Sequence, residues 1–306
     1  MRGAPDLDRQ LPTGDEIFLD HVGHFVRDAT AAAEALVRAG FAPTPRSVQV
    51  NRDDGALTGT GNIAVMLERG YSEVLFKTAD TPLGRELDGA LAHYPGLHLA
   101  ALAVADAGTA HRRLAADGFR MRPLTEMQRP VDTETGPGAA AFTIARIEPG
   151  EMAEGRIQIL THRTEETVWQ KRWLTHPNGS VALAALMIAV ADVDEAAQRF
   201  ARFTGRPAIA SPLGRTVRLD RGRLELVTAE GFTAILPETA IPRLPFMGAC
   251  GLLVRSLRDA ETVLRRGGMR TRASGAALAA PFPEALGVGA WFFAEKASDF
   301  PWQDHG

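Results

Sequence analysis

The chain has 306 residues, of which 45% are hydrophobic and 23% charged, and its formal net charge at pH 7 is -3. This composition is typical of a globular protein with one large or two smaller domains, and it excludes a disordered, collagen-like or coiled-coil chain. The negative charge and the lack of a basic run argue against nucleic-acid binding. No apolar run reaches the roughly 18 residues of a membrane helix, so no membrane partner is expected.

The N-terminus and the cysteine content predict the compartment. Residues 1–15 are polar and lack the apolar core of a signal peptide. Cys250 is the only cysteine, so an internal disulfide and a cysteine-based metal site are both excluded. We therefore expect a cytoplasmic protein.

Four stretches of the chain share one pattern, in which a short apolar strand ending in Val is followed by a polar residue and a helix. The strands are residues 19–26, 97–104, 182–190 and 247–254. The polar residues, each two positions after the Val and suited to cap a helix, are Asp28, Asp106, Asp192 and Ser256. Glycines suited to left-handed helix ends follow three of the helices, at Gly40, Gly118 and Gly268.

Extended segments follow each helix and complete the repeat. They are residues 62–67 and 71–76, then 140–147 and 156–161, then 216–219 and 223–227, and finally 290–294. The unit therefore reads β-α-β-β-β, four times. A connecting helix is expected over residues 165–174, ended by the turn at residues 176–179.

Several motifs of this repeat resemble the vicinal oxygen chelate superfamily, which includes glyoxalases, bleomycin-resistance proteins and extradiol dioxygenases. The matching stretches are LDHVGHFVRD (residues 19–28), AGF (39–41), GTGN (59–62), GYSEVL (70–75) and HPNG (176–179). The combination is most similar to the glyoxalase-like subgroup. The repeat pattern covers nearly the whole chain, and its specific motifs lie in the first half.

The resemblance implies an α+β fold of four βαβββ modules, paired into two halves that each form a half-open β-sheet cup. We expect an N-terminal half over residues 16–163 that holds the candidate active cup, a connection over 164–179, and a C-terminal half over 180–296. The C-terminal half is degenerate, since Ala185 and Ala249 occupy the opening ligand positions. Glu225 occupies the position in the third module that Glu73 occupies in the first, but the repeat gives it no histidine partner.

The resemblance also implies a divalent metal at the floor of the first cup. Carried over by motif, the ligands are His21, Glu73 and Gln158, which would suit Zn, Fe, Mn, Ni or Co. Leu99 departs from the pattern, because it occupies the opening position of the second module and cannot bind a metal. The adjacent His98 points to the opposite face of its strand, and only a bulge there would bring it in.

Each ligand position also has a structural explanation. His21 suits a buried strand position, Gln158 suits a cross-strand hydrogen bond, and Glu73 needs some partner if it is buried. Glu73 is also the candidate catalytic residue.

Further candidate pocket residues are His98, His162, Asn62 and Arg146. His162 lies about 13 Å along the strand from Gln158, at the rim or on the surface. Residues 59–62 are expected to form a turn or pocket-rim loop, because no helix follows to make a dinucleotide site.

Three functions remain open. The first is a metal-dependent lyase or isomerase that acts on a small oxygenated substrate chelated at the metal. The second is a metal-free protein that sequesters a small molecule, as bleomycin-resistance proteins do. The third is an extradiol dioxygenase, against which Leu99 and Gln158 both argue. A small-molecule partner is expected in every case, and a homodimer remains an open alternative.

Overall fold

The four predicted repeats are present in the computed structural model, which describes residues 9–51 and 54–302. The first comprises β1 (Ile17–Phe25), α1 (Ala29–Arg38), β2 (Ser47–Asn51), β3 (Leu57–Met66) and β4 (Tyr71–Lys77). The second comprises β5 (Gly96–Val104), α3 (Ala107–Ala116), β6 (Thr125–Thr133), β7 (Gly136–Arg146) and β8 (Arg156–His162). The third comprises β9 (Ser180–Ala189), α5 (Val193–Thr204), β10 (Ala208–Ser211), β11 (Gly214–Arg218) and β12 (Arg223–Val227). The fourth comprises β13 (Phe246–Val254), α7 (Leu257–Arg266), β14 (Arg272–Ser274), β15 (Ala277–Pro281) and β16 (Ala290–Ala294).

The helix ends follow the predicted capping chemistry. Oδ1 of Asp28 accepts hydrogen bonds from the backbone N–H groups of Thr30 and Ala31, so the first turn of α1 is satisfied. Gly40, which follows this helix, has a φ of 78°, in the left-handed region that favours glycine. The α+β fold of βαβββ modules is confirmed.

Other elements join the modules. They are α2 (Pro82–His93), α4 (Glu165–Val168), α6 (Ala229–Ile235) and the 3-10 segments η1 (Lys171–Trp173), η2 (Glu284–Leu286) and η3 (Ala297–Asp299). The single helix expected over residues 165–174 forms instead as the short α4 and η1. The interruption occurs at Gln170, whose backbone is extended with a ψ of 128°. None of the helices in the described residues is long and apolar enough to cross a membrane.

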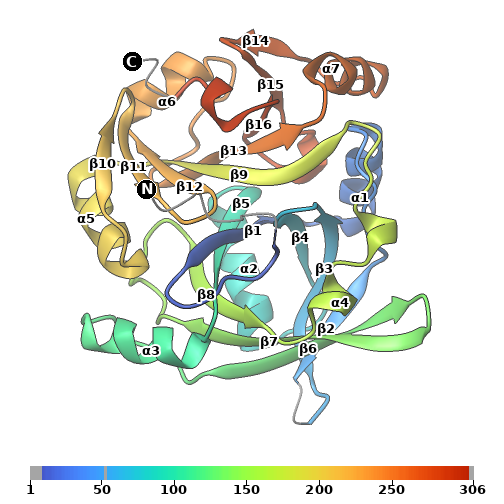
Figure 1. The fold of residues 1–306 in the computed structure, drawn as a ribbon, viewed down its shortest axis with the longest axis vertical. Coiled ribbons are helices and arrows are strands. Elements are labelled where there is room, and N and C mark those ends of the chain that lie inside the picture. Colours follow the sequence, from blue (N-terminus) through green and yellow to red (C-terminus); the bar gives the residue numbers. More distant parts are fainter. Residues whose placement is uncertain (1–8, 52–53, 303–306) are drawn as a thin grey trace.

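The strands of the first two modules close into an eight-stranded barrel (Figure 1). Their order is β1-β4-β3-β2-β6-β7-β8-β5, and β1 pairs again with β5. A short pairing of β2 with β6, through Val50–Gln128 and Asn51–Met127, completes the ring. The cup of the N-terminal half is therefore closed around its interior side chains.

Two helices cover the barrel at opposite ends. Leu87 and Leu91 of α2 and Val168 and Trp169 of the α4 region belong to the same apolar cluster as the inward-facing strand residues. Figure 1 shows α2 behind the ring of strands and α4 in front. We call these the α2 end and the α4 end of the barrel.

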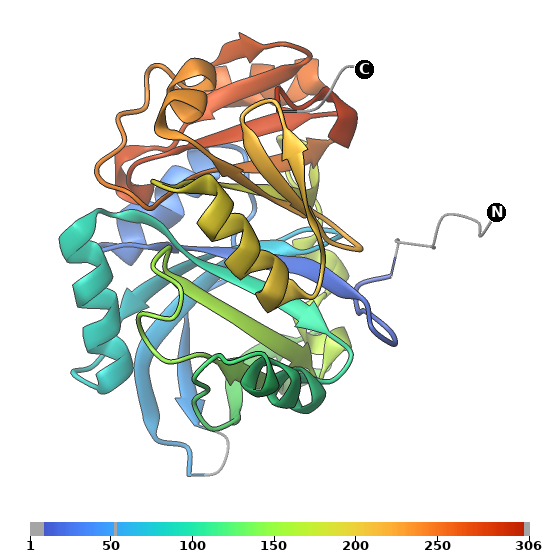
Figure 2. The ribbon, with the colours of Figure 1, turned by 90° about the vertical axis from the view of Figure 1, so that its left-hand side faces the viewer.

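The last two modules form an open sheet in the order β10-β11-β12-β9-β13-β16-β15-β14. Its concave side is filled by apolar side chains, the largest of which are Phe232, Phe246, Phe292, Phe300 and Trp302. Figure 2 shows this half stacked on the barrel. The second cup is thus packed with the protein's own aromatic rings.

The two halves share one sheet and one apolar core. β9 and β13 pair with each other, and Met247 of β13 also pairs with Leu97 of β5. In the shared core, the ring centroids of Phe41, which follows α1, and Trp291, on β16, lie 5.4 Å apart. Because sheet and core are continuous, the division at residues 163 and 180 stays a prediction.

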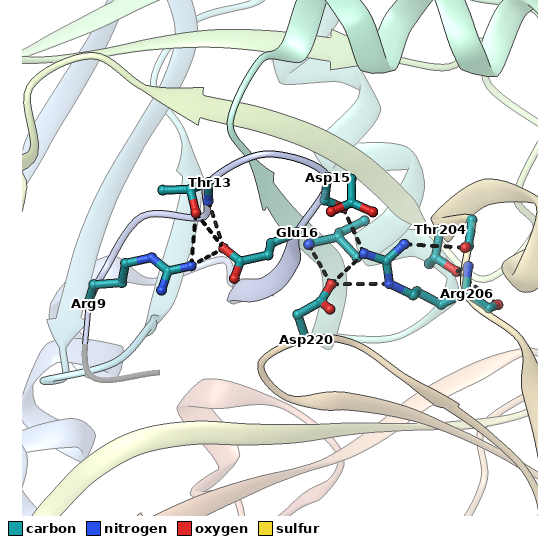
Figure 3. A network of polar contacts seen from close by, with 9 residues as sticks. Arg9, Thr13, Asp15, Glu16, Thr204, Arg206 and Asp220 are labelled. Carbon is teal, nitrogen blue, oxygen red and sulfur yellow. Dashed lines mark hydrogen bonds and ion pairs between the residues drawn. The ribbon is translucent and has the colours of Figure 1, made fainter. Parts of the chain in front are cut away.

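A polar network also joins the segment before β1 to the C-terminal half (Figure 3). Asp220 Oδ2 accepts hydrogen bonds from the backbone N–H of Ile17 at 2.9 Å and from Arg206 at 2.6 Å. Arg206 also donates to the backbone carbonyl of Asp15 at 2.7 Å. The start of β1 is therefore held in place by residues of the third module.

Candidate functional site

A bulge in β1 places two neighbouring polar residues inside the barrel. The register of β1 against β5 shifts between Leu19 and His21, so Asp20 is the additional residue. His21 stacks on Tyr71, which belongs to the interior cluster, with ring centroids 4.3 Å apart. A second register shift, between Gly23 and His24, makes His98 the additional residue of a bulge on β5.

Asp20 is fully buried and bridges two histidines. Its Oδ2 lies 2.7 Å from Nδ1 of His21, and its Oδ1 lies 2.9 Å from Nε2 of His162. Burial raises the pKa of Asp20, but the charges of His162 and His21 and their hydrogen bonds outweigh it and hold that pKa well below its usual value. Asp20 therefore stays ionised and fixes the orientation of both rings.

His21 and Glu73 face each other across β1 and β4. Because Nδ1 of His21 is bound to Asp20, the other ring nitrogen, Nε2, is directed at Glu73 Oε2, 3.7 Å away. The second carboxylate oxygen of Glu73 accepts a hydrogen bond from Asn62 Nδ2 at 2.5 Å. Both His21 and Glu73 are at least 95% buried. The arrangement orients one nitrogen and one oxygen toward a common point.

Gln158 lies farther round the barrel wall. His21 pairs with Ala101 of β5, which pairs in turn with Gln158 of β8, so two strand spacings, about 10 Å, separate the two backbones. Gln158 Oε1 accepts a hydrogen bond from Arg146 Nε at 3.1 Å. Leu99, at the fourth ligand position, is buried in the interior apolar cluster. Among the described residues, no hydrogen bond therefore joins the Gln158 side chain to the other two predicted ligands.

The other predicted pocket residues lie in the interior of the barrel or toward its α2 end. Because of the bulge on β5, strict strand alternation does not hold at His98, and its ring stacks on Tyr94 at a centroid distance of 4.1 Å and lies 5.4 Å from the ring of Phe25 in the interior cluster. Burial lowers the pKa of His98 to about 4. The expectation that His162 lies at the rim or on the surface was wrong, because the bulge brings Asp20 within reach of its buried ring. Asn62 belongs to β3 rather than to a rim loop.

Two residues of the site were not anticipated. Asp20 has no distinguishing pattern in the sequence, because its inward direction depends on the bulge. Tyr71 lies two positions before Glu73 on the same strand face, which is the signal that could have identified it. Burial, together with the carboxylates of Asp20 and Glu73, raises the pKa of Tyr71 well above its usual value, so its hydroxyl stays protonated.

A cavity of about 340 Å³ lies at the α2 end of the barrel. Arg146 lines it from the end of β7 and Arg156 from the start of β8, while His98 lines it from β5 and Tyr94 from the segment between α2 and β5. Since Arg146 also binds Gln158, this cavity borders the interior polar residues.

The positions of the predicted ligand side chains can be compared with the geometry that a metal ion requires. Within the described residues, no group of three or more His, Cys, Asp and Glu side chains is arranged to hold one. His21 and Glu73 fit as a pair, because two ligands about 2.1 Å from one tetrahedral ion lie about 3.4 Å apart, close to their 3.7 Å. The buried Asp20 behind His21 is the kind of partner that metal-binding histidines use. A third ligand position on the ion would have to be filled by Gln158, by a water molecule or by the substrate.

Comparisons with solved structures support the fold. A hypothetical protein from Staphylococcus aureus aligns with a TM-score of 0.61 at 10% identity, covering 90% of this chain and 98% of the other. A triple mutant of 4-hydroxymandelate synthase from Streptomyces coelicolor aligns with a TM-score of 0.54 at 12% identity, covering 93% and 94%. A fusion protein of a xylose isomerase-like TIM barrel and 4-hydroxyphenylpyruvate dioxygenase aligns with a TM-score of 0.55 at 14% identity, covering 94% of this chain and 50% of that one.

A comparison with curated proteins gave no significant match. The family model described as the glyoxalase-like domain matches residues 19–204, more than half of the chain. The chain therefore belongs to the glyoxalase-like domain family, within the vicinal oxygen chelate superfamily.

Proposed function

We propose that the protein is a metal-dependent enzyme of the lyase or isomerase class that acts on a small oxygenated organic molecule in the N-terminal barrel. The observation that carries the proposal is the alignment of Asp20, His21 and Glu73. Asp20 binds Nδ1 of His21, so the lone pair of Nε2 is directed at Glu73, 3.7 Å away. At 3.7 Å this contact is too long for a hydrogen bond, yet close to the separation of two ligands on one ion.

The roles of the residues follow from their contacts. His21 and Glu73 would hold the ion, and Asp20 would keep His21 in the tautomer that can bind it. A divalent ion such as Zn, Fe, Mn, Ni or Co would polarise a substrate oxygen as a Lewis acid. Asn62 fixes the carboxylate of Glu73, which is the candidate for taking a proton from the substrate. Gln158 is the candidate third ligand through the lone pair that Arg146 leaves free.

A second function, metal-free binding of a small molecule, is favoured by two observations. Leu99 places an apolar side chain at the fourth ligand position. The Arg146 guanidinium beside Gln158 would repel a divalent cation there. Leu99 and Gln158, at two of the ligand positions, argue against the third option, an extradiol dioxygenase.

Metal content separates the first two functions. Wild-type protein, purified without chelator and exposed to Mn, Fe, Co, Ni and Zn salts, is analysed for bound elements after desalting. We expect close to one transition-metal ion per chain, and its loss in His21→Ala and in Glu73→Gln. Glu225→Gln, at the corresponding position of the C-terminal half, is the matched control and should keep the ion. Failure of the wild type to retain any ion would leave the metal-free binding protein as the better explanation.

A further inference from the structure

The cavity at the α2 end is lined by an unusual number of arginines. Arg122, Arg146, Arg156 and Arg243 all contribute to its wall. They come from separated parts of the chain: the segment after α3, the end of β7, the start of β8 and the segment before β13. Residues of both halves therefore enclose one positively charged space.

The carboxylates in the wall do not neutralise these four charges. Glu86 is shared by Arg122 at 2.8 Å and Arg156 at 3.2 Å. Glu148 is the second carboxylate, 3.4 Å from Arg122. The third, Glu154, is occupied by Arg199, which donates to both of its oxygens at 2.7 and 2.9 Å.

Arg146 and Arg243 are therefore left without a carboxylate partner among the described residues. Arg243 contacts only His93, at 2.5 Å. Arg146 donates through Nε to the neutral oxygen of Gln158. A guanidinium has five N–H donors, so four of those of Arg146 have no protein acceptor in the described chain.

The environment of Arg146 disfavours an unpaired cation. Burial and the neighbouring Arg156 guanidinium lower the pKa of Arg146 to about 9. A charge removed from water is stabilised only by an opposite charge or by a full set of hydrogen bonds. The terminal nitrogens of Arg146 are not among the fully buried unpaired atoms, so they open onto the cavity.

Apolar side chains also line the cavity. Phe25, Tyr94, Ile147 and Met152 all line it. The Arg156 guanidinium lies over the ring of Phe25 at 5.2 Å and also pairs with Glu86, so both of these partners engage that cation. The cavity thus combines apolar side chains with the Arg146 guanidinium, which has no carboxylate partner among the described residues.

We propose that this cavity binds an amphipathic organic anion, whose carboxylate or phosphate group pairs with Arg146 and whose apolar body packs against Phe25, Tyr94 and Met152. Guanidinium forms paired hydrogen bonds with both kinds of oxyanion. Arg146 also holds Gln158, so a bound anion would lie next to the candidate metal pair. The identification of this anion as the substrate rests on the proposed function, whereas the anion site itself does not.

The test is calorimetric titration of metal-free protein with phenylacetate, phenyl phosphate and the uncharged 2-phenylethanol. We expect at least one of the anions to bind, and to bind at least about tenfold more tightly than the alcohol. Comparison of the two anions shows which oxyanion the site prefers. Equal binding of the alcohol and both anions, or no binding of any probe, would overturn the proposal.

Variants then test the role of Arg146. Arg146→Gln should weaken anion binding at least about tenfold, and Arg146→Lys, which keeps the charge, should restore part of it. Arg112→Gln, an exposed arginine on α3, is the control and should bind as the wild type does. Unchanged binding in a folded Arg146→Gln variant would contradict the assignment. Because the ion is absent throughout, a failure of the metal proposal leaves this result unaffected.

Discussion

At the scale of single residues, Asp20 decides the geometry of the candidate site. The family resemblance of the motifs at residues 19–28 and 70–75 predicts His21 and Glu73 as metal ligands, and the two side chains face each other. The motif did not reveal Asp20, because a strict two-residue alternation places it on the opposite face from His21. The bulge in β1 depends on the pairing with β5, which no local pattern encodes. The same bulge gives His162, which is buried against Phe142 and Trp169, its carboxylate partner.

Glu225 offers a prediction at this scale. It is fully buried on β12, with Thr216 donating to one oxygen at 2.5 Å and Arg223 4.0 Å from the other. Burial raises the pKa of Glu225 from 4.5 to about 7, although the hydrogen bond from Thr216 and the charge of Arg223 oppose the shift. The folded protein therefore holds this proton more tightly than the unfolded chain does. Its stabilising effect is complete below about pH 4.5 and is lost as the pH rises through about 7.

Glu225→Gln removes this titration. Relative to the wild type, the variant should gain stability as the pH rises from 4.5 to 7.5, by an amount on the order of 3 kcal/mol. Urea unfolding of both proteins at several pH values measures the difference. A difference in unfolding free energy that stays constant over this range would contradict the assigned pKa.

At the scale of elements, α2 closes one end of the barrel. The repeat analysis did not predict it, because residues 82–93 fall between two modules and have no counterpart in the pattern. Its local signals are nevertheless clear, since Thr81 caps the helix through Gly84 N–H and Pro82 begins it. The closure of the barrel by β2 and β6 could not be predicted, because it depends on a short pairing between distant segments.

Leu87 is the residue through which α2 can be tested. Its side chain is fully buried in the interior cluster of the barrel. Leu87→Ala should lower the free energy of unfolding by about 2–5 kcal/mol, because it removes apolar contacts and leaves a cavity. Asp88→Ala, on the exposed side of the same helix, should cost less than about 1 kcal/mol, although it removes the ion pair with Lys77. Equal costs in urea unfolding would contradict the packing of α2 on the barrel.

At the scale of the whole molecule, the two halves behave as one folding unit in our interpretation. The sequence repeat predicts two similar halves, and the structure adds how they are joined. Strand pairing, the contact of Phe41 with Trp291 and the network around Asp220 all cross between them. The N-terminal half retains the polar pair His21 and Glu73, whereas the concave side of the C-terminal half is filled by aromatic rings.

A single unfolding transition should follow from this joint core. Trp169 and Trp173 belong to the connection beside the barrel, and Trp291 and Trp302 to the C-terminal half. In a variant with Trp169→Phe and Trp173→Phe, fluorescence reports only on the C-terminal half. The change in this tryptophan fluorescence with urea should coincide with the loss of the circular-dichroism signal, which reports on the whole chain. Two separated transitions would show that the halves unfold independently.

The most direct measurement of the central claim is crystallographic. Diffraction data collected at an anomalous-scattering wavelength, from crystals grown with Mn²⁺, would locate any bound ion without reference to activity. We predict an anomalous peak within about 2.3 Å of both His21 Nε2 and Glu73 Oε2, absent in His21→Ala. Density that shows these two side chains in place with no peak between them, at a Mn²⁺ concentration that fills other sites, would contradict a metal centre in the barrel.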